Sequence, residues 1–260
     1  MTFHPVALAT HVIDTHAHVG PYFFRMGQRD VAANTALCDR WGIDLQLVSH
    51  AEGVFHDPAA GNAALAADLE ADARLRGYVV INARDLTTAR RELDRWLQPG
   101  SGFVGVKMHT HYPAAAIASP QVRDALQLLD DYSTVLLIHT WGPDVLDLAA
   151  AAEPLSTLKV IAGHMGADRW DLACEAARAV DRLYLEPSCS VALAGQMRHV
   201  MDHAPKGQVL FGTDATLLDP CVAFGQVAAG DLSPDDLEAV MWRNAVDLFG
   251  RERLGWPVSA

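Results

Sequence analysis

Side chains that could bind a metal ion stand at the ends of apolar runs in this sequence. The clearest are His16 and His18, which follow Val12 and Ile13. On a strand, alternate side chains point to the same face, so the two imidazoles would project together, with Asp14 beneath them. Paired imidazoles are common ligands of divalent metal ions. The spacing therefore predicts a metal site where the first strand ends.

Four more apolar runs end in a residue that can bind a metal or move a proton, namely Lys107, His139, His164 and Asp214. Lys107 is one of only three lysines, and a bare ammonium inside an apolar run is costly to bury. We therefore expect Lys107 to take part in chemistry. The alternative is an amine that pairs with a carboxylate in the pocket.

The ligand types indicate which ion would bind. Imidazole and carboxylate together suit zinc, or else manganese, iron or cobalt, better than calcium or magnesium. With three or four such ligands, the ion keeps a coordination position for water. The ion would lower the pKa of that water toward about 7 and polarise an incoming carbonyl. Asp214 could then accept the proton of that water. We expect one or two divalent ions, with zinc first, and a hydrolytic reaction.

The elements that would position these residues alternate regularly. Eight short strands are predicted at residues 11–18, 45–50, 76–82, 103–109, 134–140, 158–164, 183–188 and 208–214. Helices are predicted at residues 31–41, 59–75, 87–97, 120–131, 144–152, 168–180, 191–203, 220–229 and from 234 to Gly250. Ser119 and Pro120 mark one helix start, and Gly42 marks one helix end.

Eight strands that alternate with helices over about 250 residues are typical of a (β/α)₈ TIM barrel. We expect a distorted barrel that occupies residues 1–260 as one domain. The competing fold is a doubly wound sheet, but no GxGxxG turn follows the first strand, so no dinucleotide is implied. In a barrel the carboxyl ends of all strands form one rim, and the last strand neighbours the first. Asp214 would then lie beside His16 and His18.

The composition narrows the class of partner. A net charge of −12 and a pI near 5.3 argue against nucleic acid and anionic membranes, and favour a small-molecule substrate. No apolar run reaches the roughly 20 residues of a membrane span, and Met1–Pro5 lacks a signal-peptide pattern, so a cytoplasmic protein is expected. The four widely spaced cysteines are expected to be reduced. The sequence leaves open whether the protein forms a homo-oligomer.

Taken together, these residues resemble the amidohydrolase superfamily, in particular its short single-domain branch of hydrolases and decarboxylases. The resemblance spans essentially the whole chain. It rests on the strand-one pair His16-Ala17-His18, the strand-four Lys107, the strand-five His139, the strand-six His164 and the strand-eight Asp214.

The resemblance implies two ways to use Lys107. In members with two metals, the strand-four lysine is carboxylated and bridges the ions, and His139 and His164 would bind the second one. In members with one metal, the ligands would be His16, His18, His139 and Asp214, and His164 would serve in catalysis. We favour the two-metal form, although the sequence is compatible with both.

Residues in the loops after strands are expected to contact the substrate. We assign this role to Arg25, His109 and Trp141, with the aromatic run that begins at Tyr22 as a wall. The leading function is hydrolysis of an amide, a lactone or another ester. The alternative is a nonoxidative decarboxylase or hydratase, which a basic residue such as Arg25 or Arg169 would favour. A third, less favoured interpretation is a non-catalytic binding barrel.

Overall fold

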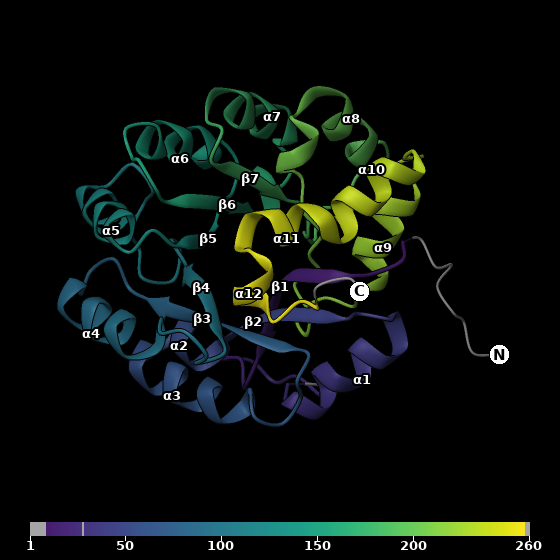
Figure 1. The fold of residues 1–260 in the computed structure, drawn as a ribbon. Helices are drawn as coiled ribbons and strands as arrows, with labels where there is room; N and C mark the ends of the chain where they lie inside the picture. Colours follow the sequence, from purple (N-terminus) through teal and green to yellow (C-terminus); the bar gives the residue numbers. More distant parts are fainter. Residues whose placement is uncertain (1–8, 28, 258–260) are drawn as a thin grey trace.

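Seven parallel strands form the inner layer of the fold, and helices surround them (Figure 1). The computed structural model describes residues 9–27 and 29–257. Each strand pairs with the next along the chain, in the order β1 to β7. The strands are β1 Ile13–Val19, β2 Leu45–His50, β3 Leu75–Ile81, β4 Phe103–Met108, β5 Val135–His139, β6 Lys159–Gly163 and β7 Leu183–Glu186.

Helices connect consecutive strands and cover the outside of the sheet (Figure 1). They are α1 Val31–Trp41, α2 Ala51–Phe55, α3 Pro58–Asp68, α4 Leu86–Trp96, α5 Pro120–Asp131, α6 Asp144–Ala152, η1 His164–Gly166, α7 Trp170–Ala179, α8 Gln196–His203, η2 Lys206–Gln208, α9 Cys221–Ala228, α10 Pro234–Glu238, η3 Ala239–Arg243, α11 Asn244–Phe249 and α12 Arg251–Leu254. No helix in residues 9–27 and 29–257 has the length and apolar character that a bilayer crossing requires.

The eighth predicted strand, residues 208–214, closes the ring without forming a regular strand. On one side the Leu210 amide donates to the Leu185 carbonyl at 2.9 Å. On the other side the Thr15 amide donates to the Phe211 carbonyl at 2.9 Å, and the Asp214 amide donates to the His16 carbonyl at 2.7 Å. This segment therefore stands between β7 and β1, and the TIM-barrel prediction is confirmed with an irregular eighth member.

An irregularity in β1 decides which side chains face the site. The register with β2 shifts between Asp14 and Ala17. Ala17 packs in the layer between strands and helices, so His16 and His18 on either side of it face inward. Asp14 instead bonds to Gln46 of β2. The expectation that Asp14 lies beneath the two histidines on one face is wrong, because the shift interrupts the alternation.

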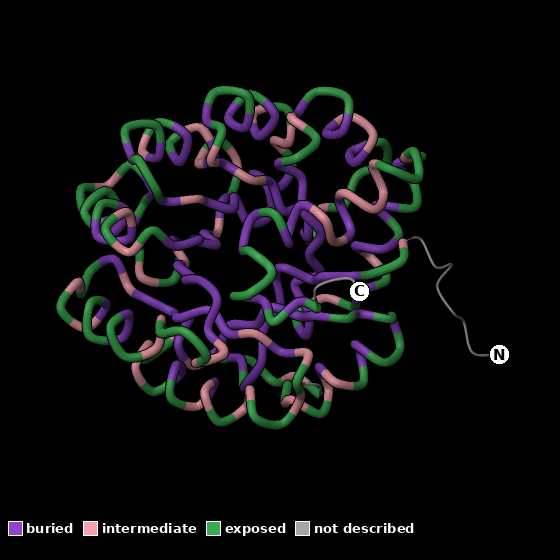
Figure 2. Tube along the Cα trace, viewed as in Figure 1, coloured by how far each residue is buried: buried purple, intermediate pink, exposed green. Residues whose placement is uncertain are grey.

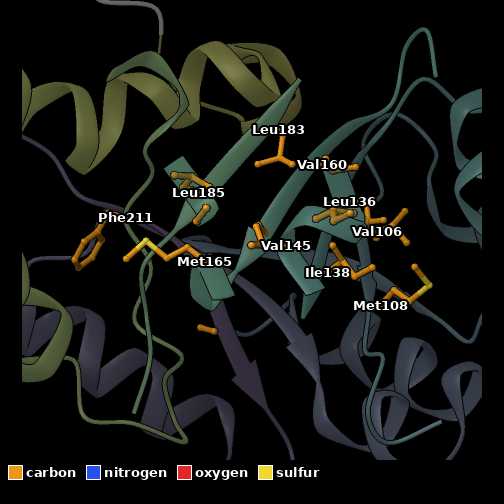
Figure 3. Packing of buried hydrophobic residues seen from close by; sticks show 14 of the residues in the cluster. Val106, Met108, Leu136, Ile138, Val145, Val160, Met165, Leu183, Leu185 and Phe211 are labelled. Carbon is orange, nitrogen blue, oxygen red and sulfur yellow. The ribbon is translucent and has the colours of Figure 1, made fainter. Parts of the chain in front are cut away.

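Buried residues follow the strands and the inner sides of the surrounding helices (Figure 2). The apolar ones among them form two clusters. The larger one fills the space between strands and outer helices, and Figure 3 shows its part along β4 to β7. The smaller one fills the barrel interior with inward residues such as Ile13, Leu47 and Leu137, and packs against Phe249 of α11 and Leu254 of α12. The two C-terminal helices thus close one end of the barrel, where the strands begin. The other end carries the predicted ligands.

Local signals explain where the helices begin and end. The Asp30 and Ser119 side chains accept hydrogen bonds from backbone amides and start α1 and α5, each worth about 1 kcal/mol. Gly42 ends α1 with φ of 66°, a conformation that favours glycine. The long helix expected from 234 to Gly250 is interrupted by the π turn η3.

Candidate metal centre

His16 projects from β1 into the barrel and has a partner on each ring nitrogen. Its Nδ1 lies 2.5 Å from Oε2 of Glu186, and its Nε2 lies 2.8 Å from Nζ of Lys107. Because a carboxylate accepts hydrogen bonds, Nδ1 carries the proton and Nε2 keeps its lone pair. That lone pair is the one a metal ion would use. His16 and Lys107 thus meet across the barrel, as the sequence predicted.

His18 and Asp214 face each other beside His16. Nε2 of His18 lies 3.2 Å from Oδ1 of Asp214, and the same oxygen lies 3.7 Å from Nε2 of His16. The other nitrogen of His18 is bonded to the Ser49 hydroxyl at 2.9 Å. Asp214 has φ of 55°, which is uncommon for a residue with a side chain and often marks a functional site.

Glu186 at the end of β7 belongs to this site, although the sequence analysis did not select it. Its carboxylate is fully buried and also accepts hydrogen bonds from the Ser188 amide at 2.6 Å and the Ser188 hydroxyl at 2.9 Å. A Cβ at Gly212 would come within 2.4 Å of Oε1 of Glu186, so glycine leaves the space that this carboxylate needs. The signal was present, because Leu183–Glu186 is another apolar run that ends in a possible ligand.

His164 follows β6 in the short turn η1. Its φ is 66°, and Met165 has φ of 38°, so two residues that are not glycine adopt left-handed backbone. Nδ1 of His164 donates to the Ser188 carbonyl at 2.6 Å, which leaves Nε2 as the nitrogen that faces a further partner. Its ring lies 4.9 Å from the ring of His16. The strained turn therefore holds the imidazole of His164 beside that of His16.

His139 at the end of β5 is held differently. Its ring stacks on His109 with centroids 4.1 Å apart and lies 4.8 Å from the ring of His164. Nε2 of His139 is buried and has no hydrogen-bond partner among the described residues. A buried nitrogen without a partner costs free energy unless a ligand or water satisfies it.

The donor set fits a divalent metal ion. Within the described part of the chain, two groups have ligand atoms within 4.8 Å of one another: His16, His18 and Asp214, and His16, His164 and Glu186. The first group combines two imidazoles with a carboxylate, and both histidines have their second nitrogen held by another side chain, as in known metal sites. His139 belongs to neither group, although its ring is adjacent to His164.

Burial and neighbouring charges set the protonation of the centre. Burial and nearby Lys107 lower the pKa of His16 well below its usual range. Burial lowers the pKa of Lys107 to about 8 and raises that of Glu186 to about 7. Burial opposes ionisation of Asp214, but the hydrogen bond with His18 and the adjacent histidines hold its pKa below the usual range. At neutral pH the site therefore offers a neutral imidazole and an ionised carboxylate.

A cavity of about 130 Å³ opens above these residues. Its lining residues are His18, Tyr22, Val54, Phe55, Lys107, His109, Tyr112, His139, Trp141, His164, Ser190, Asp214, Leu217 and Leu218. The structure thus places His109 and Trp141 in the cavity, where a substrate would contact them. Arg25 is exposed and Arg169 is half-buried, and neither lines the cavity; Arg169 donates a hydrogen bond to Asp171 instead.

The chain belongs to the amidohydrolase family, since the model of that family matches residues 13–251. This membership confirms the expected enzyme class. No curated protein sequence matches the chain.

Solved structures share the fold at low identity. One is 5-carboxyvanillate decarboxylase from Sphingomonas paucimobilis, with 16% identity over 93% of this chain and 99% of that chain, and a TM-score of 0.73. Another is dihydroxybenzoic acid decarboxylase from Polaromonas sp. JS666 with bound manganese and 2-nitroresorcinol, with 16% identity, 93% and 97% coverage, and a TM-score of 0.73. A third is a probable 2-pyrone-4,6-dicarboxylic acid hydrolase from Acinetobacter baumannii, with 14% identity, 93% and 100% coverage, and a TM-score of 0.69.

Proposed function

We propose that this protein is a metal-dependent hydrolase that cleaves an amide, a lactone or another ester of a small molecule. The observation that carries the proposal is the convergence of His16, His18 and Asp214 at the base of an open cavity. The ion we propose is zinc, with manganese, iron or cobalt as alternatives; a manganese-bound neighbour supports a divalent ion in this fold. Once bound, the ion would polarise the carbonyl and favour deprotonation of water.

The protein's own residues would handle the proton. Asp214 is the general base, because its carboxylate is ionised, lies 3.2 Å from His18 and lines the cavity. His164 is the second group of the mechanism, since the Ser188 carbonyl engages its Nδ1, its Nε2 stays available for proton transfer, and its ring lines the same cavity. It would accept the proton from Asp214 or, in the two-metal form, act as a ligand.

Lys107 determines whether a second ion binds. Burial lowers its pKa to about 8, so a usable fraction of the amine is neutral and able to form a carbamate with carbon dioxide. A carbamate there would bridge to a second ion bound by His139 and His164. Nε2 of His139, which has no hydrogen-bond partner among the described residues, supports this arrangement. Without the carbamate, Lys107 would present an ammonium group that pairs with a negative group of the substrate.

Decarboxylation of a carboxylated ring is the second candidate. The specific observation in its favour is that aromatic side chains surround a cavity with Lys107 at its base, where an ammonium would pair with a substrate carboxylate. The solved structures that share the fold include decarboxylases of aromatic acids. No arginine of the described residues lines the cavity, which favours hydrolysis over this candidate.

Isotope labelling separates the two reactions. The zinc-loaded protein would be incubated in H₂¹⁸O with lactones, esters, amides and carboxylated aromatic compounds, and products would be analysed by mass spectrometry. Hydrolysis places one solvent oxygen in the acid product, whereas decarboxylation releases carbon dioxide and leaves no new oxygen on the ring. We expect labelled acid that disappears in Asp214→Asn and after chelation. Carbon dioxide release without labelled acid would overturn the hydrolase proposal, and no turnover across the panel would favour a binding protein.

A further inference from the structure

The exposed apolar side chains of this protein gather at one end of the barrel. Among the described residues, every large exposed hydrophobic side chain lies in a loop that follows a strand or the segment at 208–214. These residues are Phe23, Phe24, Tyr112, Trp141, Leu193 and Leu217. Single exposed apolar residues are ordinary on a protein surface, but a group at one place indicates a binding site. The metal centre lies at this same end.

Aromatic rings connect this surface to the metal centre without a break. At the base, the ring centroid of His109 lies 4.1 Å from that of His139 and 4.2 Å from that of Tyr112. The ring centroids of Tyr112 and Phe55 are 4.6 Å apart, and those of Phe55 and Phe23 are 5.1 Å apart. Ring pairs at such distances attract each other and favour a further ring. One wall of the cavity is therefore aromatic from base to rim.

The chemical character of the cavity changes with depth. The lysine and aspartate that line it, Lys107 and Asp214, both belong to the metal centre, whereas Val54, Leu217 and Leu218 are among the other lining residues. The cavity volume of about 130 Å³ is close to the roughly 150 Å³ that accommodates one benzene molecule in a protein interior. The cavity therefore fits a molecule that has a polar end and one uncharged ring.

Tyr22 supplies a second, independent sign of a ligand. It lines the cavity, is 8% exposed, and its hydroxyl has no hydrogen-bond partner within the described residues. Its ring packs against those of Phe24 and Phe55, with centroid separations of 5.4 Å and 5.3 Å. A phenol is protonated at neutral pH and needs an acceptor when it is buried. A bound molecule with an oxygen near the ring would provide that acceptor.

We propose that the substrate carries one uncharged aromatic ring, which packs against Phe55 and Tyr112, and an oxygen that accepts a hydrogen bond from Tyr22. This inference rests on the proposed function and assigns it a substrate class, an ester, lactone or amide with an aryl group next to the reacting carbonyl. Tyr22 is a specificity residue in this account.

Binding of two simple hydroxamates tests the inference without turnover. Benzohydroxamate and acetohydroxamate carry the same metal-binding group and differ in the ring, so calorimetry on the zinc-loaded protein isolates the ring's effect. We expect benzohydroxamate to bind at least about tenfold more tightly. Phe55→Leu and Tyr112→Ala should each remove about two- to tenfold of that preference and leave acetohydroxamate unchanged. Leu193→Ala, at the rim but outside the cavity lining, is the matched control.

A separate variant tests the hydroxyl of Tyr22. Tyr22→Phe keeps the ring and should weaken both hydroxamates by about two- to tenfold, because both carry the same oxygens. Unchanged affinities would overturn the role of Tyr22, and equal affinities of the two hydroxamates for the unaltered protein would overturn the aromatic site while leaving the metal centre intact. If neither hydroxamate binds, the metal centre fails, and this inference fails with it.

Discussion

The two sides of the site differ in how their histidines are held. On the side of β1 and β7, His16 and His18 each have the second ring nitrogen bonded, to Glu186 and Ser49. On the side of β4 and β5, His109 and His139 stack on each other, and Nε2 of His139 has no partner in the described part of the chain. We call the first the bonded side and the second the stacked side.

The difference indicates which side is arranged before anything binds. A hydrogen bond to the second nitrogen fixes both the tautomer and the orientation of an imidazole ligand. The bonded side is therefore prepared for an ion. On the stacked side, Nδ1 of His109 accepts from the His111 amide at 3.2 Å, but stacking leaves Nε2 of His139 without a partner among the described residues. That nitrogen would gain a partner from a second ion, a carbamate on Lys107 or the substrate. Each of the following changes tests this contrast.

The largest effect is expected at Asp214, the proposed base on the bonded side. Asp214→Asn keeps the size of the side chain but cannot accept the proton, so kcat should fall by about 10²–10⁴-fold on any substrate found in the labelling experiment. Asp68→Asn is the matched control, because Asp68 also lies near a histidine, His50, but outside the cavity lining. A fully active Asp214→Asn variant would remove Asp214 from the mechanism.

A smaller effect is expected behind His16. Glu186→Gln replaces the buried carboxylate with an amide and should lower the affinity for zinc about 10–100-fold, as loss of a ligand's supporting group does. Competition with a chromogenic chelator measures this directly. Glu92→Gln, a buried carboxylate bonded to Asn62 and Trp96, should leave zinc affinity unchanged. Unaltered affinity in folded Glu186→Gln would show that the bonded side does not depend on Glu186.

The pH dependence of stability tests the residue behind the bonded side. Burial raises the pKa of Asp14 from 3.8 to about 7, so the folded state keeps a proton that the unfolded chain releases. Its contribution to the free energy of unfolding is therefore present below about pH 4 and is lost as pH rises to about 7. Relative to Asp14→Asn, the metal-free protein should lose on the order of a few °C in Tm between pH 5 and pH 8. A constant difference in Tm would contradict the raised pKa.

The smallest effect is expected on the stacked side. His109→Phe preserves the stacking on His139 and removes both ring nitrogens, so zinc affinity should change by less than about threefold. The same chelator competition applies. A loss as large as that of Glu186→Gln would mean that the stacked side also holds the ion, and the contrast between the sides would fail.

Elements with their own end signals could be predicted from the sequence. The ranges 31–41 and 120–131 match α1 and α5, where Asp30 and Ser119 cap the first turn. Elements whose shape depends on the rest of the fold could not. The segment 208–214 leaves the extended conformation at Asp214 to bring the carboxylate toward His18, and the predicted 191–203 helix begins only at Gln196, after Gly195 with φ of 78°.

The candidate site shows the same division. His16, His18, Lys107, His164 and Asp214 meet because the ends of parallel strands share one rim. The exposure of Arg25 could not be predicted, because nothing in the sequence determines the direction of its loop. Glu186 was missed although it ends an apolar run, because a single acid at a strand end also looks like an ordinary polar boundary. Its contact with His16 on another strand distinguishes the two interpretations.

Metal content per chain tests the central claim most directly. The unaltered protein, His16→Ala and His139→Ala would be prepared with zinc in bicarbonate buffer without chelator, checked for folding by circular dichroism, and analysed by inductively coupled plasma mass spectrometry. We predict at least one equivalent in the unaltered protein, a near-complete loss in His16→Ala, and a smaller loss in His139→Ala. Two equivalents in the unaltered protein would support a carbamate on Lys107. An unaltered protein without metal, or a folded His16→Ala that retains its full content, would contradict the account.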